Sequence, residues 1–312
     1  MDAVTDKEAW ERPIAAAERS GVLYPDRLAR YAAGWIEPAR DVSAVVDQYW
    51  HVSWALDETE RLDQPIIDLP AVTLTAEEGA VPAPLVITGV HGRAWRRTIR
   101  GRGRVFAIRL RPAGLSVLSD LTPAHVADAT VPLTGKFDSR LHTLMQTVSA
   151  DADPAERARA ADQAIRQALQ ERAPTSVGLL ANSVLDELRE SSHHRIGPTL
   201  AERFARSERT VQRACIDTLG HGPKWLSRRI RLQEVAVALV ARPIDDLATI
   251  AADLGYTDQS HLTRDFRSAT GVTPASYRRA ITDLTAGTER GIEANDRDGP
   301  TRQNVAEFRF NV

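Results

Sequence analysis

The clearest pattern of apolar and polar positions lies near the C-terminus, where it occurs twice, about fifty residues apart. Each copy has the period of a short helix, a tight turn and a second helix with polar side chains on one face. The apolar positions are Leu200, Phe204, Val211 and Cys215 in the first copy and Ile250, Leu254, Leu262 and Phe266 in the second. The pattern predicts two helix-turn-helix units, and two in tandem are a more specific signal than one. Such units read DNA, so double-stranded DNA is the expected partner.

Cap and turn residues set the limits of the predicted helices. Thr199 begins a capping-box pattern, so a helix starts there. Ser207 is placed to cap the next helix, which Gly220 can end. In the second copy Gly255 stands in the turn, where a positive φ is often needed. The first copy has Ala205 at that position, which is a weaker fit.

A longer helix is predicted between the two units, over residues 223–240. Its apolar residues recur at helical spacing, at Leu226, Ile230, Val235, Ala236 and Leu239. Roughly 18 residues at about 1.5 Å each give a rod about 27 Å long. Successive major-groove faces of B-DNA lie about 34 Å apart. A stiff helix of this length could hold two recognition helices near one helical turn apart, so that one chain reads an asymmetric site.

The front of the chain has the period of β-strands. Phe106, Ile108 and Leu110 fall on one face of a strand, with Arg109 and Arg111 opposite. Short apolar or β-branched runs occur at 45–54, 71–75, 85–88, 98–100 and 105–110, and the last two flank a predicted hairpin turn at 101–103. Several short strands without alternating helices predict a small barrel or sandwich.

The pattern changes to helical near residue 151. Residues 155–171 are rich in Ala, Glu, Arg and Gln, and 175–189 carry an apolar stripe, so both are predicted helices. The fold class is therefore α+β. We expect a β-rich domain at 21–135, a helical linker at 136–176, a tandem helix-turn-helix domain at 177–282 and a flexible tail at 283–312.

Charge and composition narrow the setting. The net charge is −2, yet residues 195–279 hold fourteen Lys or Arg against nine Asp or Glu, a balance of +5, as binding to phosphates requires. No apolar stretch approaches membrane-spanning length and no signal peptide is evident, so we expect no membrane partner. The single cysteine, Cys215, allows no internal disulfide and fits a reduced, cytoplasmic setting.

The C-terminal pattern resembles the AraC/XylS family of bacterial transcription regulators over residues 177–282. The resemblance is carried by residues 255–266, which read GYTDQSHLTRDF, and 271–279, which read GVTPASYRR. These are very close to the signature of that family's second unit. The first unit departs from the pattern, with Ala205 for the usual Gly and Cys215 for a usual Phe.

The resemblance implies which side chains read DNA. Base-facing positions fall on Arg209, Gln212 and Arg213 in the first unit and on Gln259, Ser260, Thr263 and Arg264 in the second. The chemistry fits independently, because Arg can bond guanine and Gln can bond adenine through two atoms at once. Phosphate contacts, or a solvated helix face, are expected for Arg228, Arg229, Arg231, Arg278 and Arg279.

The front segment resembles the uncharacterised, cupin-like sensor domains found ahead of such units. A barrel mouth of this kind can hold one small molecule. The side chains best suited to line such a pocket are Tyr49, Trp50, His51, Trp54, His91 and Trp95, although such aromatics are more often core. Eight arginines between Arg93 and Arg111 could serve an anionic effector, but a solvated sheet face is the simpler interpretation.

Two chemical alternatives are weak. Cys215 could be a redox switch or an alkyl acceptor, but its spacing places it in the core. A metal enzyme of the cupin type would show a His-x-His pair. The front domain instead has isolated His51, His91, His125 and His142, and His193 and His194 form an adjacent pair further along the chain. We therefore assign no metal, no other cofactor and no catalytic residue.

The sequence favours a sequence-specific transcription regulator over two alternatives, a cupin-type enzyme with an added helical domain and an architectural DNA-binding protein. The tandem units disfavour the first alternative, and the sizeable β-rich domain disfavours the second. RNA polymerase is the expected protein partner. A small-molecule effector and a homodimer formed through the front domain remain open expectations.

Overall fold

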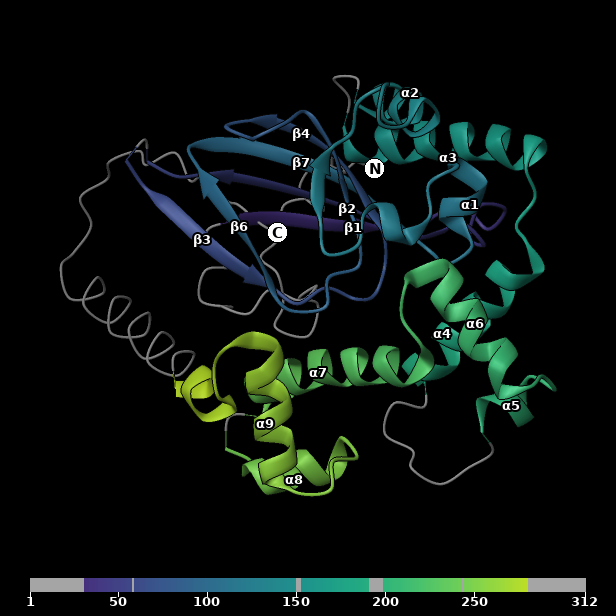
Figure 1. Ribbon diagram of the computed structural model, residues 1–312. Coiled ribbons are helices and arrows are strands. Elements are labelled where there is room, and N and C mark those ends of the chain that lie inside the picture. The colour runs from purple at the N-terminus through teal and green to yellow at the C-terminus, as the bar shows by residue number, and fades with distance from the viewer. Residues whose placement is uncertain (1–30, 58, 150–152, 191–198, 243, 280–312) are drawn as a thin grey trace, which may run out of the picture.

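The computed structural model describes residues 31–57, 59–149, 153–190, 199–242 and 244–279. The predicted tail at 283–312 and the pair His193 and His194 lie outside these ranges. Strands fill the first half of the described chain and helices the second, as expected for an α+β protein (Figure 1). In none of the described helices is there an apolar stretch long enough to cross a bilayer.

Two antiparallel sheets make up the β-rich half. The larger has the strand order β1 (Tyr31–Ile36), β2 (Val46–Ala55), β7 (Arg102–Leu110), β4 (Thr73–Gly79), β5 (Leu85–Thr88) and β8 (Thr130–Pro132). The smaller pairs β3 (Arg61–Ile66) with β6 (Trp95–Arg100). The hairpin predicted at 101–103 is therefore wrong, because β6 and β7 belong to different sheets. Gly101, at φ +49°, turns the chain from one sheet into the other.

Alternation along the strands separates the two faces of the large sheet. Phe106, Ile108 and Leu110 are buried together, on the face covered by α1 (Gly114–Leu118), α2 (Ser139–Val148) and α3 (Pro154–Glu171). The opposite face carries Val105 and Arg109 and looks toward the small sheet. The predicted alternation in β7 is thus confirmed, and it decides which side chains can meet a ligand.

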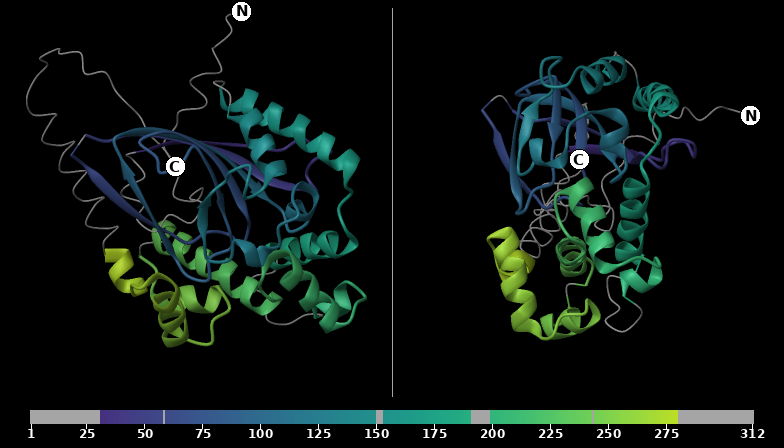
Figure 2. Two further views of the ribbon diagram at one scale, coloured as in Figure 1. Left: turned by 45° about the horizontal axis from the view of Figure 1, so that its top comes forward. Right: turned by 45° about the vertical axis from the view of Figure 1, so that its right-hand side comes forward.

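The helical half packs below the sheets, on the side opposite α2 and α3, in both views of Figure 2. Its helices are α4 (Ser176–Glu190), α5 (Leu200–Arg203), α6 (Glu208–Leu219), α7 (Pro223–Ala241), α8 (Leu247–Asp253) and α9 (Gln259–Thr270). Residues 274–279 form one further helical turn and a half. A short 3₁₀ turn, η3 (Pro123–His125), links the halves by packing on α6.

Four of the described strands and α-helices have no counterpart in the sequence prediction: β1, β3, β8 and α1. Helix α2 lies inside the predicted helical linker at 136–176, but the prediction gave it no bounds of its own. For α2 a signal was present, because Asp138 caps the helix and apolar residues follow at helical spacing. β3 gave little signal, since Pro65 and charged residues interrupt its pattern and a strand of this kind is stable only when paired.

Candidate nucleic-acid interface

The first helix-turn-helix unit consists of α5 and α6. A capping box joins Thr199 to Glu202 at the start of α5, and Ser207 caps α6 by accepting a hydrogen bond from the N–H of Thr210. The C-cap of α6 is Gly220 at φ +77°. These caps confirm the predicted helix limits. They also orient α6 so that its outer face carries the predicted base-contacting residues, Arg209, Gln212 and Arg213, all exposed.

The turn of this unit holds a strained residue. Ala205 sits at φ +48°, in the left-handed region that costs an L-residue about 1 kcal/mol or more. Gly255, at the matching place in the second unit, has φ +69° without that penalty. The turn therefore forces one backbone shape on both units, and the first unit adopts it despite its side chain.

Ala205→Gly is expected to stabilise the protein by about 1 kcal/mol, because it removes the left-handed strain at an exposed position. Denaturant unfolding measures the change. Ala252→Gly is the matched control: Ala252 is exposed inside α8, so glycine there should cost about 1 kcal/mol. If both substitutions destabilise equally, the strain at Ala205 is not real.

The second unit consists of α8 and α9. Asp258 caps α9 through the N–H of His261 at 2.8 Å, and Gly271 ends it at φ +81°. Leu262 and Phe266 are fully buried against α8 and the residues after α9. Of the base-contacting residues predicted here, three are exposed and one is half-buried. These are Gln259, Ser260 and Arg264, and the half-buried Thr263.

Helix α7 joins the two units, and its first half touches both recognition helices. A groove between α6 and α7 is lined by Gln212, Lys224 and Arg228. Arg228 also forms an ion pair with Asp265, the neighbour of Arg264 on α9. The 19 residues of α7 span about 28 Å. One cation of this stiff helix thus faces the groove beside α6 and pairs with a carboxylate of α9.

The five arginines predicted to contact phosphate differ in their exposure to solvent. Arg228 and Arg279 are exposed. Arg231 is half-buried, with its guanidinium 5.2 Å from the centre of the Tyr256 ring, and the half-buried Arg278 donates to the carbonyl of Asp245 at 2.5 Å. The expectation for Arg229 is wrong. This residue is only 3% exposed and donates to the carbonyl of Asp68 at 2.8 Å, where no phosphate can reach it.

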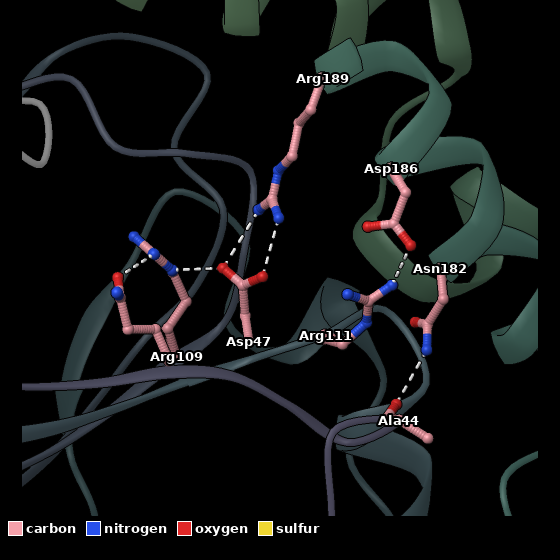
Figure 3. Close-up of polar contacts among 8 residues, drawn as sticks. Ala44, Asp47, Arg109, Arg111, Asn182, Asp186 and Arg189 are labelled. Atoms are coloured by element: carbon pink, nitrogen blue, oxygen red, sulfur yellow. Dashed lines mark hydrogen bonds and ion pairs between the residues drawn. The ribbon is translucent and has the colours of Figure 1, made fainter. Parts of the chain in front are cut away.

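The β-rich half holds α4 through polar contacts that sequence reasoning missed (Figure 3). Asn182 donates to the carbonyl of Ala44 at 2.8 Å. Arg189 binds Asp47 at 2.7 Å, and Asp47 also accepts from Arg109 of β7 at 2.7 Å. A further ion pair joins Arg111 to Asp186. One carboxylate thus serves two guanidinium groups, one from each half of the molecule.

Two more helices of the helical half contact the β-rich half. On α7, Gln233 donates to the carbonyl of Ile67 at 2.6 Å, next to the Arg229 contact with Asp68. At the C-terminal end of α9, the carbonyl of Ala269 accepts from the N–H of Ala94 at 2.9 Å. The contacts use the C-terminal end of α9, so its first turns, which carry the predicted base contacts, stay clear of the front half.

A cavity lies between the two sheets. The empty space inside it and in the open solvent at its mouth totals about 840 Å³. Three of the predicted pocket residues line it: Trp50, Trp54 and Trp95. The other three do not, which corrects the prediction. Tyr49 and His51 alternate with Trp50 along β2 and so face away from the cavity, and the Tyr49 hydroxyl donates to Asp162 of α3 at 2.8 Å. His91 stacks behind the ring of Trp95.

Cys215 is buried in the core of the first unit. Burial raises the pKa of its thiol to about 12, so the reactive thiolate is scarce at neutral pH. This environment is that of a packing residue. Within the described ranges, no three His, Cys, Asp or Glu side chains come together as a metal site would require.

Comparisons with known proteins fit this geometry. A family described as a helix-turn-helix domain matches residues 200–280, and a family described as a domain of unknown function, DUF6597, matches residues 35–132. No curated protein matches the chain.

Among solved structures, the C-terminal domain of AraT, a response regulator from Geobacillus stearothermophilus, is 23% identical over 34% of this chain and 88% of its own, with a TM-score of 0.31. ToxT from Vibrio cholerae is 8% identical over 75% of this chain and 99% of its own, with a TM-score of 0.42. With TM-scores below 0.5, these likenesses carry no argument about the arrangement or ligands of this chain. The family match and the two capped units agree that the C-terminal part of the chain is an AraC-type helix-turn-helix domain, the DNA-binding part of a transcription regulator.

Proposed function

We propose that the protein is a sequence-specific regulator that reads two adjacent major-groove segments, one with α6 and one with α9. The observation that carries this proposal is the exposure of Arg and Gln side chains on both recognition helices, held by one stiff helix between them. Arg209, Arg213 and Arg264 can each bond guanine, and the glutamines can bond adenine. No catalytic step is part of the proposal.

Phosphate contacts would fix the register of the two helices on the duplex. Arg228, Arg279, Arg231 and Arg278 remain our candidates, with the first two the most accessible. Arg228 faces the groove beside Gln212, so a phosphate there would compete with Asp265 for its guanidinium. Arg229 is excluded from this set by its burial.

The β-rich half would control how the helical half, which is the DNA-reading half of this proposal, presents α6 and α9 to DNA. We propose that a small effector in the cavity, or pairing of two chains through the front half, shifts the contacts to α4 and α7. Occupancy of the DNA site then changes recruitment of RNA polymerase in the bacterial cytoplasm. The contacts of Asp47 and Asp68 support this proposal, because each joins the β-rich half to a helix of the DNA-reading half.

The direct test is footprinting on the DNA upstream of the protein's own coding sequence, at two salt concentrations. We expect protection over about two helical turns and affinity that falls steeply with salt, since several phosphates are neutralised. Protection of a single turn would mean that only one recognition helix enters a groove. Binding that ignores salt would contradict the predicted phosphate contacts.

Arg264→Ala is expected to weaken binding to the target by about 10- to 100-fold and to relax the base preference in one half of the site, because a bidentate contact to a base contributes about 1–3 kcal/mol. Competition binding with single-base variants of the site measures both effects. Arg159→Ala on α3 removes the same charge from an exposed position remote from the recognition helices, and should change neither. An equal loss on all sequences would make Arg264 a phosphate contact.

A further inference from the structure

The cavity between the sheets has one apolar and one polar wall. Trp50, Val52 and Trp54 of β2 form the apolar side, which Ile66 and Ile99 of the small sheet extend. The polar side consists of hydroxyls on neighbouring strands, at Thr73, Thr75 and Thr88. Such walls suit a small molecule with an apolar body and a polar head.

Three ionisable side chains also line the cavity: Asp68, Arg97 and Arg109. The charge of Arg97 is paired within the protein. The two terminal nitrogens of Arg97 bind the two carboxylate oxygens of Glu77, at 3.0 and 2.6 Å. The same guanidinium lies 5.8 Å from the centre of the Trp54 ring. Arg97 therefore closes part of the wall and has little charge left for a ligand.

Only two of the three guanidinium nitrogens of Arg109 have hydrogen-bond partners among the described residues. Its Nε donates to Asp47 at 2.7 Å and its Nη2 donates to Gln48 at 2.7 Å, whereas Nη1 makes no hydrogen bond to the described residues (Figure 3). Asp47 is shared with Arg189, so one carboxylate balances two cations. The Arg109 side chain is 13% exposed, and a guanidinium N–H that faces a cavity favours an acceptor of opposite charge.

Asp68 places a carboxyl group in the same cavity. Burial raises the pKa of this carboxyl above its ordinary value, and a bound cation would favour its ionised form. One of its carboxylate oxygens, Oδ2, accepts from the indole N–H of Trp95, and Oδ1 makes no hydrogen bond to the described residues. No described cation forms an ion pair with it; the charged or titratable groups around it are Arg109, Arg229 and His91. A cavity that presents one donor cation and one acceptor carboxylate favours a ligand that carries both complementary groups.

We propose that the cavity binds a zwitterionic small molecule of the amino-acid type with an apolar or aromatic side chain. The carboxylate of the ligand pairs with Nη1 of Arg109, the ammonium pairs with Oδ1 of Asp68, and the side chain lies against Trp50. An anion alone would leave Oδ1 of Asp68 without a hydrogen bond, and an amine alone would leave Nη1 of Arg109 without one. This inference rests on the proposed function in one respect: it names the chemical class of the effector proposed for the β-rich half.

The positions of Arg109 and Asp68 suggest how ligand binding would change the contacts between the β-rich half and the helical half. Arg109 shares Asp47 with Arg189 of α4, so a ligand carboxylate on Nη1 would add a negative charge beside the ion pairs that hold this contact. The backbone carbonyl of Asp68 holds Arg229 of α7. The ligand would therefore contact two residues that connect to the helical half. Arg109 connects to α4 through Asp47, and Asp68 connects to α7 through Arg229.

The test uses the full chain and three probes that share a benzyl group and differ in the charged groups attached to it: L-phenylalanine, phenylacetate and phenethylamine. Isothermal titration at pH 7 is expected to show L-phenylalanine binding at least tenfold more tightly than either other probe. L-leucine and L-tryptophan vary the apolar body. Phenylacetate or phenethylamine equal to L-phenylalanine would overturn the inference, as would failure of all three amino acids to bind.

Two substitutions that each remove one charge assign the roles of Asp68 and Arg109. Asp68→Asn should weaken L-phenylalanine at least tenfold and leave phenylacetate unchanged or tighter. Arg109→Gln should weaken L-phenylalanine and leave phenethylamine unchanged; if this variant does not fold, Asp68→Asn alone decides. Trp50→Ala should weaken all probes together. Equal binding of L-phenylalanine to Asp68→Asn and the unaltered chain refutes the inference.

DNA binding is measured on the same samples. Amino-acid binding without DNA binding would refute only the proposed function, whereas DNA binding without amino-acid binding would refute only this inference.

Discussion

Asp47→Ala is expected to lower the free energy of unfolding by about 3–5 kcal/mol, because it leaves a buried cation without its counter-charge. Asp47 is 11% exposed and accepts from both Arg109, which is 13% exposed, and Arg189, which is 25% exposed. Denaturant unfolding measures the loss. Hydrogen exchange should show faster opening of β2 and α4 together, because Asp47 of β2 forms the ion pair with Arg189 of α4.

Arg189→Gln is the matched control. It removes only the α4 side of the contact and leaves Arg109 paired, so we expect a cost of about 1 kcal/mol or less. If Asp47→Ala costs no more than this control, Asp47 does not hold the two halves together.

The pH dependence of this contact has a definite sign. Burial alone would raise the pKa of Asp47, but hydrogen bonds and charges from Arg189 and Arg109 outweigh it and lower the pKa below its ordinary value. A carboxyl with a depressed pKa stabilises the fold above its unfolded pKa, about 4. The difference between the unaltered chain and Asp47→Ala should thus stay constant from about pH 5 to 8 and shrink only below about pH 4.

Phe266→Ala is expected to cost about 3–5 kcal/mol and to remove DNA contact from one half of the site. Phe266 is 0% exposed, and its ring centre lies 5.5 Å from that of Tyr277. It fills the small core on which α9 rests, together with Leu262 and Ile250. Without this ring α9 loses its support. Footprinting should show protection by the α5–α6 unit alone.

Phe266→Leu keeps most of the buried volume and should cost about 1.5 kcal/mol or less, with both halves of the site still protected. If Phe266→Ala removes both halves equally, the two units do not act as separable readers. If it removes neither, α9 is not a recognition helix.

The effects at Asp47 and Phe266 would act at different levels. The Asp47 contact joins two bodies that each have a core, so its loss should loosen their arrangement and leave α6 and α9 formed. The Phe266 ring lies inside one unit, so its loss should remove one reader and leave the front cavity intact. Ligand and DNA binding measured on both variants would separate sensing from reading.

Local signals made the DNA-reading half predictable from the sequence. Ser207, Gly220 and Gly271 set helix ends through bonds that span three or four residues, and such bonds depend little on the remainder of the fold. The same holds for the alternation in β7, which divides Phe106 from Arg109. Even the poor fit of Ala205 in its turn was visible in the sequence, and the backbone there is indeed left-handed.

Tertiary contacts decided what the sequence left open. Arg229 looked like a phosphate ligand because it sits among other arginines, but a carbonyl 161 positions earlier in the chain captures it. Strand parity alone separates Tyr49 from Trp50, and which face meets the cavity depends on where α3 packs. The pairing of Asp47 with Arg189 joins residues 142 positions apart. Helix limits arise from neighbours along the chain, whereas burial and pairing of charges arise from neighbours in space, and only the folded protein brings those together.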